Sequence, residues 1–343
     1  MLRDRGFLGR KTGTFTLQWH LTNACPFHCR HCYDRSSRGE PSLAEARVIL
    51  ADLRQFCRQA GVSPQLSLSG GDPLHYSHFW DLYRSIADAA IPTSILGNPI
   101  PPETIDALLR AHRPVYYQVS LEGLREHNDL IRGRGHFDLV MDFLANARGA
   151  GLETHVMLTL TRANLDQVIP LGEQLRGLTG RFTFNRLAQV GEGRDLEGAT
   201  KTELVRFLKD YLEARRSNPV FGFKDNLFNI LRRQAGRRLF PGCTGFGCGA
   251  AFNFVALLPD GEVHACRKFP SRIGDIRKSN LQAIYHSEEA RGYRAGSLSC
   301  RQCRLRHACG GCLAVSHGRR LDPLRDRDPY CFADDPEPSA VLL

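Results

Sequence analysis

Short β-branched or apolar runs alternate with amphipathic stretches over the first two-thirds of the chain, from residue 14 onward. The short runs are typical of β-strands, and the amphipathic stretches are typical of helices that bury one face. We predict strands at residues 14–20, 65–69, 93–97, 115–121, 153–160 and 181–187. We predict helices at residues 43–60, 78–89, 102–111, 137–150, 165–178 and 201–216.

Six strand–helix repeats of this kind indicate a parallel sheet and an α/β fold, namely a partial (β/α)6 TIM-like barrel. Such a barrel is two units short of a closed eight-fold one. In barrels of this kind the chemistry lies at the carboxyl ends of the strands. The loops that follow residues 20 and 69 are therefore the first places to look for functional side chains.

The alternating pattern stops after about residue 218, where Gly and Arg become more frequent and eight of the twelve Cys residues follow. This part has too few large apolar residues to be held by burial alone, so we expect bound metal to stabilise it. The predicted division is an N-terminal extension (1–13), a barrel (14–217), a bridging segment with a helix near 226–238 (218–240), a Cys-rich domain (241–333) and a tail (334–343).

Composition narrows the class of protein. No apolar stretch approaches the roughly 18–20 residues that span a bilayer, and the N-terminus lacks the apolar region of a signal peptide. We therefore expect a cytoplasmic protein with reduced thiols, whose Cys clusters indicate metal binding or catalysis rather than disulfides. The net charge of +10 suits an acidic peptide, phosphate or nucleic acid, or simply an Arg-rich solvated face.

Cys25, Cys29 and Cys32 form a C-x3-C-x2-C motif in the loop after the first predicted strand. Three thiolates can hold three corners of a cubane iron–sulfur cluster and leave the fourth iron open. With Tyr33 after the third Cys, the motif resembles the signature of the radical S-adenosylmethionine (SAM) enzymes. The resemblance implies that the open iron chelates the amino and carboxylate groups of SAM.

The Cys-rich domain repeats a second known spacing. It reads Cys243-x4-Cys248, Gly261-x4-Cys266, then Cys300-x2-Cys303-x5-Cys309-x2-Cys312, and finally Cys331. This resembles the SPASM extension of radical SAM enzymes, except that the family usually has three residues before the last Cys of the quartet. The resemblance implies two auxiliary [4Fe-4S] clusters, with the ligands Cys243, Cys248, Cys266 and Cys312 in one and Cys300, Cys303, Cys309 and Cys331 in the other. Cys312 is the ligand that the shortened spacing puts in doubt.

The alternative for these Cys pairs is structural zinc, which binds four Cys thiolates in many small domains. Taken alone, residues 300–312 would favour zinc, but the upstream triad and Gly261-x4-Cys266 favour iron–sulfur. Four Cys ligands for each cluster leave no open iron, which indicates electron transfer rather than direct substrate binding.

The resemblance also implies residues that position SAM. The turn of Gly70, Gly71 and Asp72 resembles the family's Gly-Gly-Glu-Pro turn, and its glycines allow close backbone approach. Ser120 and Glu122 resemble positions that contact the SAM ribose and the substrate cavity. Arg132 could pair with the SAM carboxylate or could be a surface loop Arg. Weaker candidates are Asn164, Asn185 and Arg186.

The implied function is reductive cleavage of SAM to a 5′-deoxyadenosyl radical, which abstracts hydrogen from a substrate. SPASM proteins mostly modify ribosomally made peptides, so the expected substrate is a precursor peptide that gains a cross-link, thioether or ring. The alternatives are a small molecule such as a tetrapyrrole and sulfatase maturation. Sulfatase maturases have an Asp base after the Cys equivalent to Cys266, where this chain has Arg267-Lys268. An alternative of another class is a non-catalytic metal scaffold for nucleic acid.

The expected partners are the precursor peptide and an electron donor such as flavodoxin or ferredoxin. Because the first predicted strand begins near residue 14, we expect either a separate leader-binding protein or recognition at the barrel mouth. No membrane partner is expected, and nucleic acid is disfavoured.

Overall fold

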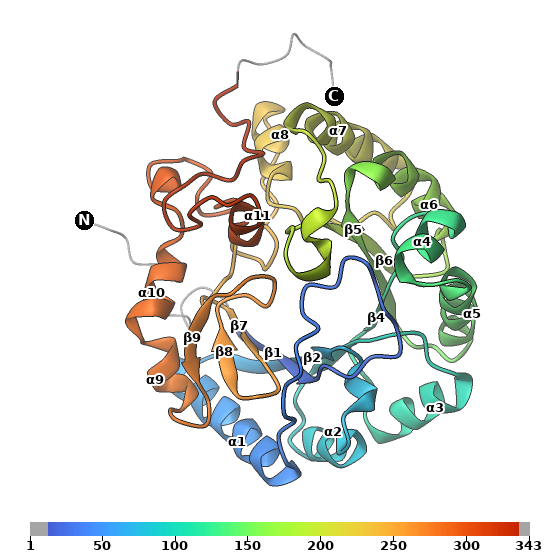
Figure 1. Ribbon diagram of the computed structural model, residues 1–343, viewed down its shortest axis with the longest axis vertical. Coiled ribbons are helices and arrows are strands. Elements are labelled where there is room, and N and C mark those ends of the chain that lie inside the picture. Colours follow the sequence, from blue (N-terminus) through green and yellow to red (C-terminus); the bar gives the residue numbers. More distant parts are fainter. Residues whose placement is uncertain (1–12, 336–343) are drawn as a thin grey trace.

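The computed structural model describes residues 13–335, which form a mixed α/β fold around one nine-stranded sheet (Figure 1). The strand order is β6-β5-β4-β3-β2-β1-β7-β8-β9. The strands are β1 (Thr14–Thr22), β2 (Ser63–Gly70), β3 (Thr93–Leu96), β4 (Tyr117–Ser120), β5 (Thr154–Leu160), β6 (Arg181–Arg186), β7 (Phe254–Leu257), β8 (Glu262–His264) and β9 (Arg272–Asp275). Of the predicted 1–13 extension and 334–343 tail, only residues 13, 334 and 335 lie within the described residues.

Strands β1 to β6 pair in parallel with their neighbours in chain order, which confirms the predicted partial barrel. The barrel is not closed, because β6 and β9 lie at opposite edges of the sheet. Strand β7 pairs in parallel with the free side of β1, and β8 and β9 continue the sheet in antiparallel fashion. The Cys-rich part therefore extends the same sheet.

The helices lie around the outside of the curved sheet (Figure 1). They are α1 (Leu43–Ala60), α2 (Phe79–Asp88), α3 (Pro102–Ala111), α4 (Arg125–Arg132), α5 (His136–Gly149), α6 (Val168–Gln174), α7 (Lys201–Ser217), α8 (Phe228–Gln234), α9 (Leu281–Tyr285), α10 (Glu288–Ala295) and α11 (Leu313–Gly318). Short 3-10 turns are η2 (Pro73–His75), η3 (Arg162–Gln167), η4 (Gly191–Asp195) and η5 (Leu298–Cys300). None of the helices in the described part is long and apolar enough to cross a membrane.

Helix α1 shows why the sequence forms this element here. Ser42 caps its first turn in a reciprocal capping box with Glu45, and Gly61 ends it in the left-handed conformation, with φ of 66°. Its buried side chains recur at helical spacing and include Cys57, which is 1 % exposed. Cys57 is therefore a small core residue, as its lack of any motif predicted.

The strands alternate between a face that packs on the helices and a face that lines the barrel. On β1, the side chains of Phe15, Leu17 and Trp19 belong to the hydrophobic core, whereas Thr16 and Gln18 line an internal cavity. Strands β2 and β4 repeat this arrangement, with polar residues such as Ser67 and Gln118 lining the same cavity. The barrel interior is therefore polar, which suits a ligand site better than a packed core.

Candidate active site

The loop after β1 crosses the opening of the barrel and carries all three predicted cluster thiols (Figure 1). Cys25, Cys29 and Cys32 line a cavity of about 370 Å³, here called the mouth cavity. The same cavity is lined by residues at the carboxyl ends of β2 to β6, where a parallel barrel places its chemistry. Of the residues predicted to position SAM, Tyr33, Gly70, Gly71, Ser120 and Arg132 line it, as do the weaker candidates Asn185 and Arg186.

The Gly70-Gly71 turn holds the base of this loop by close backbone contact. Its amide groups donate to the loop, from Gly71 to the Thr22 carbonyl and from Asp72 to the Ala24 carbonyl, both at 2.8 Å. A Cβ atom at Gly71 would lie 2.4 Å from the Ala24 carbonyl oxygen. Glycine is therefore required here by the approach of the Cys loop.

Asp72 lies behind the cavity rather than in its wall. Its side chain is buried, accepts the Leu74 amide at 3.1 Å and accepts the Asn98 side-chain amide at 3.0 Å. The same Asn98 nitrogen lies 3.6 Å from the Cys25 sulfur. Asn98 therefore connects the Gly-Gly turn to the first cluster thiol, a contact that the sequence analysis missed.

Glu122 is likewise buried behind the cavity, in an ion cluster. It lies 2.8 Å from His31 Nε2 and 2.5 Å from Arg132 Nη2, and it accepts the Thr159 amide at 2.7 Å. The charges of His31 and Arg132 lower the pKa of this carboxyl well below its usual range, against the effect of burial. His31 stands between two cluster thiols, so this ion cluster ties the Cys loop to the ends of β4 and β5.

Arg132 extends from Glu122 toward the predicted cluster. Its Nη1 atom lies 3.7 Å from the Cys29 sulfur. Burial raises the pKa of the Cys29 thiol, and the nearby Arg132 charge partly opposes that effect. A cationic neighbour favours the thiolate form that an iron–sulfur cluster needs. The predicted pairing of Arg132 with the SAM carboxylate remains a prediction.

All twelve Cys residues are free of disulfides. The eleven that belong to the predicted clusters each line a cavity. In residues 13–335, no three Cys, His, Asp or Glu side chains converge closely enough to surround one metal ion.

A second cavity of about 510 Å³, here called the inner cavity, lies deeper along the strands. Cys243, Cys248, Cys266 and Cys312 all line it, which is the quartet that the SPASM resemblance implies for the first auxiliary cluster. Asn185 and Arg186 line both the mouth and the inner cavity, whereas Asn164 instead bonds the Glu122 and Thr159 carbonyls. Cys312 thus lies with its predicted partners despite its shortened spacing.

The other quartet also comes together. Cys300, Cys303, Cys309 and Cys331 line one small cavity of about 20 Å³ beside Asp328. Asp328 is buried, accepts the Cys312 amide at 2.8 Å and receives two hydrogen bonds from Arg186, at 2.8 and 2.7 Å. This carboxylate therefore contacts both Cys quartets and the end of β6.

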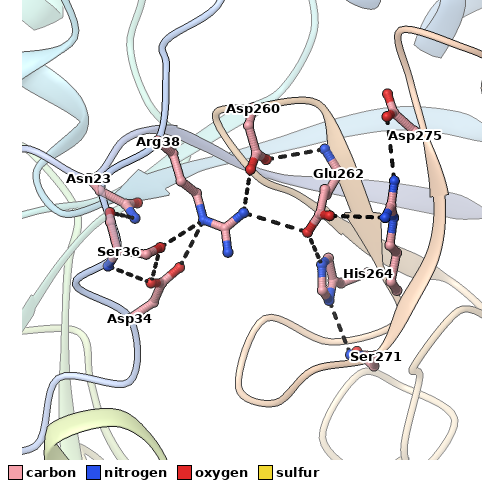
Figure 2. A network of polar contacts seen from close by, with 10 residues as sticks. Asn23, Asp34, Ser36, Arg38, Asp260, Glu262, His264, Ser271 and Asp275 are labelled. Carbon is pink, nitrogen blue, oxygen red and sulfur yellow. Dashed lines mark hydrogen bonds and ion pairs between the residues drawn. The ribbon is translucent and has the colours of Figure 1, made fainter.

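A polar network joins the Cys loop to the hairpin of β7 and β8 (Figure 2). Arg38 lies between Asp34, at 3.4 Å, and the hairpin carboxylates of Asp260 and Glu262. Glu262 also accepts from His264 at 3.1 Å. The network anchors the end of the Cys loop on the C-terminal part of the chain.

Comparison with known proteins identifies the family to which this chain belongs. The family model of the radical SAM superfamily matches residues 19–175, and the model of the SPASM iron–sulfur cluster-binding domain matches residues 248–312. The mycofactocin maturase MftC of Mycolicibacterium smegmatis is 30 % identical over 92 % of this chain and 82 % of its own length. This chain belongs to the radical SAM superfamily. It is therefore an enzyme whose domains bind SAM and [4Fe-4S] clusters.

Two further proteins are similar to this radical SAM protein, one in sequence and one in structure. The AdoMet-dependent heme synthase of Methanosarcina barkeri is 25 % identical over 92 % of this chain and 95 % of its own length. The crystal structure of Streptococcus suis SuiB bound to SAM has a TM-score of 0.72, with 18 % identity over 93 % of this chain and 77 % of that one. SuiB thus has the same fold.

The sequence analysis missed four residues of the site. Asn98 contacts the first cluster thiol, and His31 lies beside Glu122. Arg267 and Lys268 form part of the cavity walls. Asn98 follows the third predicted strand just as Gly70 follows the second, so its position at a strand end was the available signal. No sequence signal indicated that His31 points inward.

Proposed function

We propose that this radical SAM enzyme modifies a ribosomally made precursor peptide by forming a cross-link, thioether or ring. The observation that carries the proposal is the sequence similarity to the mycofactocin maturase MftC, which is 30 % identical over 92 % of this chain and 82 % of its own length. The mouth cavity at the strand ends and the inner cavity along the strands, about 370 and 510 Å³ in volume, offer room for SAM and for a substrate side chain.

In this proposal Cys25, Cys29 and Cys32 hold the SAM-binding cluster, and the walls around Gly70, Ser120 and Arg132 orient SAM. When bound, the cluster and SAM supply one-electron cleavage chemistry and hence hydrogen abstraction from the substrate. Glu122 and His31 keep the loop in place from behind the cavity. The eight C-terminal Cys residues hold the two auxiliary clusters, which would accept or deliver electrons.

The test uses anaerobically reconstituted protein with SAM, a reductant and the short peptide encoded beside the gene. We expect 5′-deoxyadenosine together with a change in peptide mass. Loss of two hydrogens would indicate a cross-link or ring closure, and larger losses would indicate side-chain cleavage. Formation of deoxyadenosine with an unchanged peptide would refute the peptide substrate.

A triple Cys25→Ala, Cys29→Ala, Cys32→Ala variant is the matched test of the cluster assignment. We expect it to lose SAM cleavage and about four irons per chain, while the auxiliary clusters stay. Cys57→Ala is the control, because Cys57 is a buried core residue of α1 that lines neither the mouth cavity nor the inner cavity. SAM cleavage that persists in the triple variant would contradict the assignment.

A second candidate function is modification of a porphyrin side chain. It is favoured by the heme synthase relative, which matches 95 % of its own length. The same reaction with an iron porphyrin in place of the peptide separates the two candidates, since only the true substrate changes mass. Sulfatase maturation is disfavoured by Arg267 and Lys268, because a cation replaces the expected Asp base.

We further propose an electron donor such as flavodoxin or ferredoxin, because the chemistry consumes an electron. For recognition of the peptide we propose either a separate leader-binding protein or the barrel mouth. We place the enzyme in the cytoplasm, because eleven thiols that hold clusters must be kept reduced. Activity that depends on an added flavodoxin and its reductase would support the donor.

A further inference from the structure

Arg267 and Lys268 stand where three cavities meet. Both line the mouth cavity, the inner cavity and a third, outer cleft of about 990 Å³. They directly follow Cys266, which lies two residues beyond the end of β8 (Glu262–His264). A substrate that enters from the outer cleft and reaches the predicted SAM site must pass these two side chains.

The charge around the inner cavity is unbalanced. Its walls carry Arg186, Lys224, Arg267 and Lys268 but only one carboxylate, Asp225. Asp225 already pairs with Arg186 at 2.6 Å. Within residues 13–335, Lys224, Arg267 and Lys268 make no ion pair with a carboxylate. Three cations that share a confined space repel one another. The thiolates of Cys243, Cys248, Cys266 and Cys312, which line the same cavity, would offset part of this repulsion, and a substrate anion beside Arg267 would offset more.

Arg267 is held in place but keeps donors free. Its guanidinium lies 6.0 Å from the centre of the Tyr33 ring, and Nη1 lies 3.5 Å from Gln18 Oε1. Its Nε atom is buried and has no hydrogen-bond partner among the described residues. A buried donor without a partner is costly, so this geometry favours a ligand that accepts from it.

The cations could instead serve only to balance the charge of the auxiliary cluster. That role explains Lys268, which lines the inner cavity together with Cys266 and Cys312. It does not explain why Arg267 and Lys268 also form walls of the outer cleft, which none of the Cys residues lines. Nor does it explain the contact of Arg267 with Tyr33, which lies on the side of the SAM-binding loop.

We propose that Arg267 and Lys268, with Lys224 behind them, form a subsite for a carboxylate of the substrate. A guanidinium fork binds a carboxylate through two parallel hydrogen bonds. The anion would hold the reacting part of the substrate between the mouth cavity and the first auxiliary cluster. The inference rests on the proposed function only in assigning this carboxylate to a peptide, either on an acidic side chain or at the chain end.

The first experiment tests the subsite without a peptide. Reduced holoenzyme is titrated with ¹³C-carboxylate-labelled glutarate, and binding is followed by the paramagnetic relaxation that the clusters induce. We expect binding of glutarate but not of glutaramide, and a roughly ten- to hundredfold weaker affinity in Arg267→Gln. Arg267→Lys keeps the charge but loses the guanidinium fork, so it should retain only part of the affinity. Arg110→Gln, on the outer face of α3, is the control and should match the wild type.

Two results would overturn the subsite. One is equal binding of glutarate and glutaramide by the wild type. This comparison needs no variant, so it still tests the subsite if Arg267→Gln fails to load its clusters. The other is unchanged glutarate affinity in Arg267→Gln and Lys268→Gln together with a shifted auxiliary-cluster potential, because the cations would then serve the cluster alone.

The second experiment identifies the source of the carboxylate. The peptide encoded beside the gene is compared with its C-terminal amide and with versions in which Asp and Glu are exchanged for Asn and Gln. We expect one of these changes to lower kcat/KM at least tenfold in the wild type and to have little effect in Arg267→Gln. If the wild type modifies no peptide, the proposed function fails while the glutarate result still stands or falls by itself.

Discussion

At the residue scale, the active site is organised by buried polar side chains, some in the wall of the mouth cavity (Asn98) and some behind it (Asp72 and Glu122). Asp72 and Asn98 support the first cluster thiol, and Glu122 supports the loop through His31. A third group continues this arrangement, since Asn128 accepts the Glu122 amide and donates to His136 at 3.3 Å. Asp72, Asn98, Glu122 and Asn128 each make a hydrogen bond, which limits the cost of burying them.

His136 provides the first prediction. Burial and the charge of Arg132 lower its pKa from 6.5 to about 4, so the folded state favours the neutral ring. The unfolded state therefore binds a proton more readily, and stability is full above pH 6.5 and falls as the pH drops toward 4. This residue alone should remove about 1 kcal/mol of the free energy of unfolding between pH 7.5 and pH 5.5.

Anaerobic urea unfolding at these two pH values measures the effect. His136→Gln should reduce the difference between them by about that amount, and exchange of the exposed His307 for Gln is the control. An unchanged pH dependence in His136→Gln would show that other groups carry it.

At the scale of elements, the Gly-Gly turn after β2 and the Cys loop after β1 form one unit. A methyl group at Gly71 would meet backbone rather than a movable side chain, so the two loops could not keep their contact. We expect Gly71→Ala to lose the SAM-binding cluster, about four irons per chain, and with it SAM cleavage.

Gly149 offers a matched control, because it lies near the end of α5 and an added Cβ would meet nothing within 4 Å. Gly149→Ala should keep all iron and be neutral or slightly stabilised. Iron analysis and electron paramagnetic resonance distinguish the variants, and full cluster content in Gly71→Ala would contradict the proposed role of the turn.

The elements also show what the sequence could predict. Six strands and their helices followed from clear hydrophobic runs, and the Cys motifs followed from spacing. The predicted 165–178 helix is instead divided into η3 and α6, and helix α4, which carries Arg132, was missed. Strands β7 to β9 were missed because they have only three or four residues and lie outside the strand–helix alternation that made the equally short β3 and β4 recognisable. Contacts such as Asn98 with Cys25 depend on tertiary packing, which no local pattern encodes.

At the scale of the whole molecule, Arg186, Asp225 and Asp328 connect the barrel to the Cys-rich part through buried ion pairs. Asp328 is also within hydrogen-bonding distance of the Cys312 amide. Removing one partner of a buried pair leaves an uncompensated charge, which costs about 3–5 kcal/mol. We therefore expect Asp328→Asn to lower the free energy of unfolding by about that amount and to alter the spectrum of the first auxiliary cluster.

The exposed pair of Arg84 and Asp81 supplies the comparison, since both side chains are about half exposed or more. Arg84→Gln should cost less than 1 kcal/mol, because solvent screens such pairs. Urea unfolding of the two variants under anaerobic conditions measures the difference. Equal destabilisation by the two variants would mean that the ion pairs of Arg186 do not hold the barrel and the Cys-rich part together.

The central place of β1 in the sheet has a consequence for how the protein is made. One side of β1 pairs with β2 early in synthesis, but the other side waits for β7, which is more than 200 residues further along the chain. Until then the emerging chain exposes an open strand edge, which is a ready template for aggregation. Such distant pairing is also slow to form. A chaperone that shields this edge, and slow translation at low temperature, should therefore raise the yield of cluster-loaded enzyme.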